Sequence, residues 1–214
     1  LQIVATIFPE YDWVKEILGD QAENVDLTLL LGNGTDMHSF QPTMEDILKV
    51  STCDLFIYVG GESDSWVADA LKGAGNPDRK AINLMDVLGD QVKEEELVEG
   101  MQDEDDHTHE EGHTHDDDLE YDEHVWLSLK NASLFCDTIA SSLADADPEH
   151  SRLYQQNAEA YEEKLAALDQ EYQTSVEKSQ SKTLLFADRF PFRYLIDDYN
   201  LTYYAAFAGC SAET

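Results

Sequence analysis

Short, mostly apolar runs alternate with stretches whose apolar residues recur at helical spacing over most of the chain. The expected strands are 1–8, which Pro9 ends, 25–31, 55–59, a weaker 81–83, 183–187 and 202–209, and we expect those at 55–59 and 183–187 to be buried. The expected helices are 11–18, one from Thr43, 66–71, one from about Ser128, a long one over 148–179, and one over 188–201 that Pro191 punctuates. In the helix from Thr43, the spacing predicts a buried face with Met44, Ile47, Leu48 and Cys53. Strands that alternate with helices predict β-α-β units with parallel sheets, and therefore an α/β fold.

The helical pattern over 148–179 is the longest in the chain. Pro148 stands early in it, where proline is favoured. Apolar residues then follow at alternating steps of three and four, namely Tyr154, Ala158, Tyr161, Leu165, Leu168, Tyr172 and Val176. At the rise of an α-helix this element would be roughly 45 Å long, so we expect it to span the molecule.

The strands after it restart the β-α-β pattern, but two strands and a helix cannot close a lobe. We therefore expect a second, incomplete lobe.

The composition is that of a globular protein with a strong negative charge. A chain of 214 residues with 42% hydrophobic residues can bury a sizeable core. The 46 acidic residues against 13 basic ones give a formal charge of -33, which argues against binding nucleic acid and favours attraction of cations. The apolar runs are far too short to span a membrane. The N-terminus does not resemble a signal peptide, so we expect either a cytosolic protein or one whose export signal has been removed.

The cysteines do not form a zinc site of their own. Cys53, Cys136 and Cys210 stand far apart and contain no CxxC pair. Cys53 and Cys136 have apolar neighbours, so we expect them to be small buried residues, and the pairing of the three thiols stays open.

A His-rich acidic stretch, DEDDHTHEEGHTHDDD, covers 103–118. It contains His107, His109, His113 and His115 as two His-Thr-His units and no hydrophobic residue, so we expect a mobile loop. Neutral imidazole is the commonest side-chain ligand of zinc in proteins. The stretch therefore predicts metal capture, and the alternative is a solvated acidic linker whose histidines are incidental.

Two further histidines stand at positions where ligands bind in parallel α/β folds. His38 lies in the Gly- and Asp-rich loop GNGTDMHSFQPT after the second strand, and such loops leave the carboxyl ends of strands. His124 stands beside Trp126 at the entry to a helix, just after the His-rich stretch. Either histidine could instead be a surface or packed structural residue. The nearby His-rich stretch favours metal ligation by both.

Taken together, these segments resemble a known family. GNGTDMHSFQPTMEDI and DEHVWLSLKNA resemble the two His motifs of the metal-specific substrate-binding proteins of ABC importers, the zinc and manganese type. A His- and acid-rich loop between the motifs is typical of the zinc branch. GESDSWV, the long helix and FAGCSAET resemble further family segments, so the resemblance covers the whole chain.

The resemblance implies two α/β lobes joined by one long rigid helix, with a metal ion in the cleft between them. We assign 1–143 to the first lobe, with the His-rich acidic loop at 101–120, 144–180 to the helix and 181–214 to the start of the second lobe. His38 and His124 would be two ligands, and the loop histidines accessory ones. The third family ligand is a His or Glu, but matching Tyr194 to the family's tyrosine puts Arg189 there.

A guanidinium group has no lone pair for a cation, so the neighbouring Asp188, or water, would take the third position. The fourth family ligand would lie beyond Thr214.

The expected function is capture of Zn(II), with Mn(II) also possible, and its delivery to an ABC permease without catalysis. The resemblance implies an extracytoplasmic monomer, either periplasmic or a cell-surface lipoprotein held by a lipid anchor, and no nucleic-acid partner. A metal-dependent adhesin is the alternative. A zinc hydrolase is a weaker one, because the sequence offers neither a nucleophile elbow nor a positioned general base.

Overall fold

Four short parallel strands form the first sheet of the computed structural model, which describes residues 1–32, 34–73, 75–96, Val98, Met101, 121–207 and Gly209. The strands are β1 (Gln2–Ala5), β2 (Asp26–Leu29), β3 (Leu55–Tyr58) and β4 (Lys80–Asn83). They lie in the order β2-β1-β3-β4, and every pairing is parallel. The four strands predicted in this half of the chain are confirmed, and the first three are shorter than the apolar runs that predicted them.

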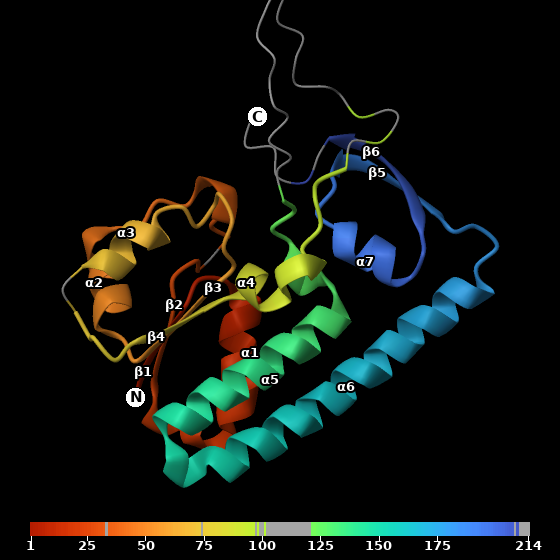
Figure 1. Ribbon diagram of the computed structural model, residues 1–214. Helices are drawn as coiled ribbons and strands as arrows, with labels where there is room; N and C mark the ends of the chain where they lie inside the picture. Colours follow the sequence, from red (N-terminus) through yellow and green to blue (C-terminus); the bar gives the residue numbers. More distant parts are fainter. Residues whose placement is uncertain are drawn as a thin grey trace, which may run out of the picture.

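Helices cover both faces of this sheet (Figure 1). They are α1 (Phe8–Leu18), α2 (Met44–Thr52), α3 (Val67–Lys72), α4 (Leu84–Leu88), α5 (Leu129–Ala146) and α6 (Ser151–Lys178). Ile3 and Leu55 belong to the cluster formed with α1, α5 and α6, whereas Val4 and Phe56 belong to the cluster formed with α2 and α3. Successive strand residues point to opposite faces, so adjacent positions supply the two layers.

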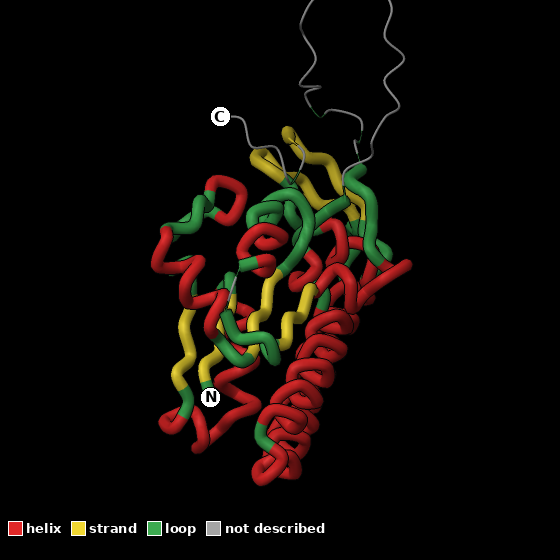
Figure 2. Tube along the Cα trace, turned by 60° about the vertical axis from the view of Figure 1, so that its left-hand side comes forward, coloured by secondary structure: helices red, strands yellow, loops and turns green. Residues whose placement is uncertain are grey.

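Helix α6 is one uninterrupted helix of 28 residues, as the sequence predicts. It follows a 3-10 turn at Pro148–His150, and its first half packs on α1 and α5 through the buried Tyr154, Ala158 and Leu165. Its far end reaches the connection between the two strands of the second sheet, where Tyr172 stacks on Tyr199 with ring centroids 5.5 Å apart. Figure 2 shows α6 running beside α5. The helix therefore connects the two sheets.

The second sheet contains β5 (Thr183–Arg189) and β6 (Thr202–Phe207), which are parallel and joined through α7 (Arg193–Asp198). Phe190, Ile196, Tyr203 and Ala205 form its buried cluster. The two parallel sheets with their helices confirm the predicted α/β class. The boundaries at 143 and 180 stay a prediction.

Several details of the sequence prediction are wrong. Met44 and Leu48, which the spacing places on the buried side of α2, are 84% and 60% exposed. The strand at 183–187 is not buried, since Leu185 is 81% exposed. The helix expected over 188–201 is limited to α7, because Pro191 cannot donate a backbone hydrogen bond within a helix. Cys53 and Cys136 are buried, as expected. Within the described ranges, no helix is long and apolar enough to cross a membrane.

Candidate metal site

His38 lies in a short 3-10 turn, Met37–Ser39, in the loop that follows β2. The carboxylate of Asp36 caps this turn by accepting the backbone N–H of His38 at 3.0 Å. On the other side, the Nδ1 atom of His38 is 3.0 Å from the hydroxyl of Ser63, in the loop after β3. Burial, and then the charge of His124, lower the pKa of His38, which favours the neutral, ligating form of its imidazole.

His124 is only 6% exposed and follows two buried acids, Asp122 and Glu123. One oxygen of Asp122 accepts the backbone N–H of His124 at 2.8 Å and lies 3.0 Å from the Nδ1 atom of the same residue. A carboxylate can only accept a hydrogen bond, so it favours the tautomer with a proton on Nδ1, which puts the lone pair on Nε2.

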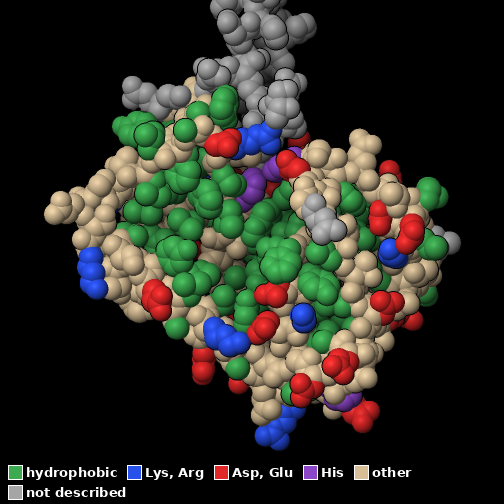
Figure 3. Space-filling model, turned by 180° about the vertical axis from the view of Figure 1, so that it is seen from behind, with side chains coloured by type: hydrophobic (Ala, Val, Ile, Leu, Met, Phe, Trp, Pro, Cys, Tyr) green, Lys and Arg blue, Asp and Glu red, His purple; other side chains and the backbone are tan. Residues whose placement is uncertain are grey.

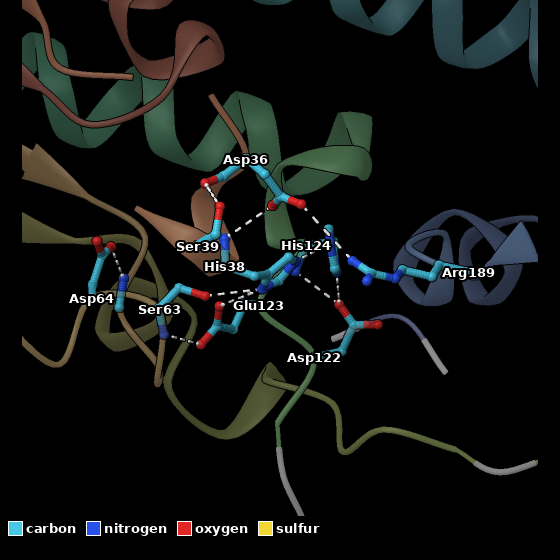
Figure 4. Close-up of polar contacts among 10 residues, drawn as sticks. Asp36, His38, Ser39, Ser63, Asp64, Asp122, Glu123, His124 and Arg189 are labelled. Atoms are coloured by element: carbon cyan, nitrogen blue, oxygen red, sulfur yellow. Dashed lines mark hydrogen bonds and ion pairs between the residues drawn. The ribbon is translucent and has the colours of Figure 1, made fainter. Parts of the chain in front are cut away.

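The two imidazoles point toward one another, although 86 positions separate them in the chain (Figure 4). Their Nε2 atoms are 3.4 Å apart. Two nitrogen ligands at about 2.0–2.1 Å from one tetrahedral zinc ion would stand about 3.3–3.4 Å apart. The separation therefore fits two ligands of a single zinc ion.

Buried carboxylates hold the loop that orients His38. Glu123 accepts the backbone N–H of Ser63 at 2.9 Å and packs against Gly61, whose φ of 75° and closeness to Glu123 leave no room for a side chain. Asp64 accepts the N–H of Gly60 at 3.0 Å, and burial raises the pKa of this carboxyl to about 6. The loop after β3 is thereby fixed beside His38.

The second sheet contributes Arg189, the last residue of β5. Its guanidinium NH1 atom lies 3.8 Å from the second oxygen of Asp36. Asp188 is exposed, and its carboxylate accepts the backbone N–H of Arg189 at 2.8 Å. Among the described residues, no group of three or more His, Cys, Asp or Glu side chains could hold a metal ion. The role of Asp188 as a third ligand stays a prediction, and the loop histidines His107, His109, His113 and His115 lie outside the described residues.

The groups that position the two histidines are not among the residues predicted from the sequence. Ser63, Asp122 and Glu123 belong to this set. A usable signal was present, because each histidine has an aspartate two positions earlier that accepts its backbone N–H. Aspartate commonly bonds to the backbone two residues on, so the repeated Asp-x-His pattern marks two turns of the same kind.

The family of the zinc-uptake complex component A, periplasmic (ZnuA), matches residues 3–214. The chain belongs to this family. The family resemblance inferred from the two His motifs is thereby confirmed.

Among its relatives, the ZnuA-family chain is 35% identical over 201 residues to the zinc-binding lipoprotein AdcA of Streptococcus pneumoniae serotype 4. It is 31% identical over 201 residues to the high-affinity zinc uptake system protein ZnuA of Bacillus subtilis. Each match covers 94% of this chain, but only 38% of the first relative and 59% of the second.

Solved structures agree with this assignment. The crystal structure of the Zn(II)-bound ZnuA-like domain of S. pneumoniae AdcA matches with a TM-score of 0.73 and 29% identity, over 98% of this chain and 67% of that one. The metal-dependent lipoprotein YcdH of B. subtilis matches with a TM-score of 0.75 and 27% identity, again over 98% and 67%. The fold is therefore that of the ZnuA-like binding proteins, in which a helix joins two lobes.

Proposed function

We propose that this protein captures zinc outside the cytoplasm, at His38 and His124, and delivers it to the permease of an ABC importer. The observation that carries the proposal is the 3.4 Å separation of the two Nε2 atoms, which suits one zinc ion. The Zn(II)-bound structure of the pneumococcal relative supports the choice of metal. The protein would act by binding and release, without catalysing a reaction.

The ligand chemistry favours zinc over the hard cations. Two neutral imidazoles suit zinc and other transition metals of intermediate softness, whereas Ca²⁺ and Mg²⁺ prefer oxygen ligands. Mn(II) is the second candidate. Asp188 or water would complete the shell, and His107, His109, His113 and His115 would be accessory ligands that collect ions at low affinity.

Periplasmic and lipoprotein relatives support a location outside the cytoplasm. There the protein would act as a monomer that is either free in a periplasm or held at the cell surface by a lipid anchor. The net charge of -33 fits a protein that attracts cations from solution.

Calorimetric titration with zinc, in competition with a chelator, tests the proposal. We expect the wild-type protein to bind one zinc ion tightly, and the double variant His38→Ala, His124→Ala to lose that site, since half of a tetrahedral shell is removed. His150→Ala is the matched control, because His150 pairs with Asp147 away from the site. Equal zinc affinity in the double variant and the wild type would refute the proposed site.

A further inference from the structure

Arg189 stands opposite the histidine pair and is tied to it through Asp36 (Figure 4). One oxygen of Asp36 accepts the backbone N–H of His38 at 3.0 Å, and the other lies 3.8 Å from the NH1 atom of Arg189. A permanent positive charge therefore faces the place where a dication would bind.

This arrangement leaves a problem of coordination and of charge. His38 and His124 supply two positions of a tetrahedral shell, and the guanidinium group cannot supply a third, because it has only donors. In a partly buried setting, a guanidinium beside a dication is repelled more strongly than it would be in water. A group that only accepts hydrogen bonds, placed between the metal ion and Arg189, would remove both difficulties. Its lone pairs could bind the metal ion, and it could also accept hydrogen bonds from the guanidinium group.

Asp36 does not fill that role in the observed geometry. In this geometry, one oxygen of Asp36 accepts the backbone N–H of the His38 turn and the other lies beside the Arg189 guanidinium, so the carboxylate is directed to these two groups. Arginine has five N–H donors in a planar fork, so the remaining donors can bind a second anion.

Small solutes can reach this place from solution. The side chain of Arg189 is 26% exposed and that of Asp36 is 52% exposed. Figure 3 shows histidine, basic and acidic side chains gathered at one point on the back of the molecule, beside a broad region of apolar side chains.

We propose that the site binds the metal ion together with a small carboxylate or oxyanion, which lies between the metal and Arg189. One oxygen of this anion takes a third position in the metal shell, which leaves one position for Asp188 or water, and another oxygen accepts hydrogen bonds from the guanidinium fork, a pairing for which arginine is well suited. The inference rests on the proposed function and deepens it, because the cargo becomes a metal and anion pair.

Zinc affinity in two salts tests the inference, with acetate as the probe anion and perchlorate as the weakly coordinating reference at equal ionic strength. The readout is the ratio of wild-type to Arg189→Gln zinc affinity, in which the binding of acetate to zinc in solution cancels. We expect this ratio to rise roughly tenfold between perchlorate and saturating acetate, the scale of one hydrogen bond to a charged group. In perchlorate, the variant should bind zinc at least as tightly as the wild type, since the repelling charge is gone.

Arg152→Gln, the same change at an exposed position of α6, is the matched control, and its ratio should not depend on the salt. A salt-independent ratio for Arg189→Gln, with tight zinc binding in both proteins, would overturn the anion proposal and leave the proposed function standing. A large loss of affinity in Asp36→Asn, equal in both salts, would also overturn it, because Asp36 itself would then be the third ligand. If the wild type bound zinc tightly neither in perchlorate nor in acetate, the proposed function would be overturned as well.

Discussion

At the scale of single residues, the site depends on how the far side of each imidazole is held. Asp122 fixes the Nδ1 atom of His124, and Ser63 contacts the Nδ1 atom of His38, each at 3.0 Å. Because both Nδ1 atoms have polar partners, the two Nε2 atoms are presented to a metal ion. Because these contacts already hold the two imidazole rings in place, the rings lose less conformational freedom when they bind a metal ion.

Asp122→Asn should weaken zinc binding by about 10- to 100-fold, the usual effect of losing a carboxylate that orients a histidine ligand. The amide can still accept the backbone N–H of His124, so the thermal unfolding midpoint of the metal-free protein should change little. Competition titration against a chelator measures the affinity. Asp20→Asn, at an exposed position, is the control. An unchanged affinity for Asp122→Asn would show that the carboxylate does not orient the ligand.

The two histidines could be selected from the sequence, and the Asp-x-His pattern was a signal for Asp36 and Asp122, but the supporting contacts from distant positions could not be predicted. His38 and His124 stand in recognisable motifs beside a His-rich stretch. The contact between His38 and Ser63 joins positions 25 apart, and Arg189 approaches Asp36 from another sheet. Nothing in local spacing encodes such contacts, because they depend on how loops at the ends of different strands pack together. The sequence did place Arg189 at the site, through its match to a family ligand position.

At the scale of secondary-structure elements, the centres of strands and helices were predictable and their ends were not. Pro9, expected to end a strand before a helix, lies within the first turn of α1, where proline is tolerated. Helix α2 shows the limit for buried faces. Its spacing favoured Met44, Ile47, Leu48 and Cys53. Ile47 and Cys53 do pack with the buried Val50 in the cluster that includes β1 and β3, whereas Met44 and Leu48 are exposed. The packing partner, not the periodicity alone, decides which side of a short helix is covered.

The start of α1 carries a titratable group that links folding to pH. Burial raises the pKa of Glu10 to about 8 from 4.5. Its Oε2 atom accepts the backbone N–H groups of Thr6 and Ile7 at 2.8 and 3.1 Å, and within the described structure its buried Oε1 atom has no hydrogen-bond partner. The folded protein keeps a proton that the unfolded chain releases between pH 4.5 and 8, so stability should fall as pH rises through this window.

Glu10→Gln should remove this pH dependence, because the amide reproduces the neutral carboxyl group. We expect the free energy of unfolding of the wild type, relative to the variant, to fall with rising pH by at most about 1.4 kcal/mol per pH unit. Urea unfolding at about pH 5 and about pH 8 measures the difference. Glu149→Gln, at an exposed position, should retain the wild-type pH dependence. Parallel pH profiles for wild type and Glu10→Gln would contradict the assignment of a buried neutral acid.

At the scale of the whole molecule, α6 sets the relation between the two sheets. Its length was predictable from the apolar spacing, since the pattern continues over about eight turns without a break. The position of the second sheet was not, because it depends on contacts such as Tyr172 with Tyr199 and the hydroxyl of Tyr194 with the backbone carbonyl of Asp122 at 2.9 Å. Through these contacts, Arg189 of the second sheet reaches the loop that carries His38.

The central claim is that one zinc ion binds between His38 and His124. An anomalous difference map recorded at the zinc absorption edge, from crystals grown with zinc, tests it most directly. We expect a strong peak about 2.0–2.1 Å from the Nε2 atoms of both histidines. A map with zinc bound elsewhere on the protein and no peak between these two atoms would contradict the account.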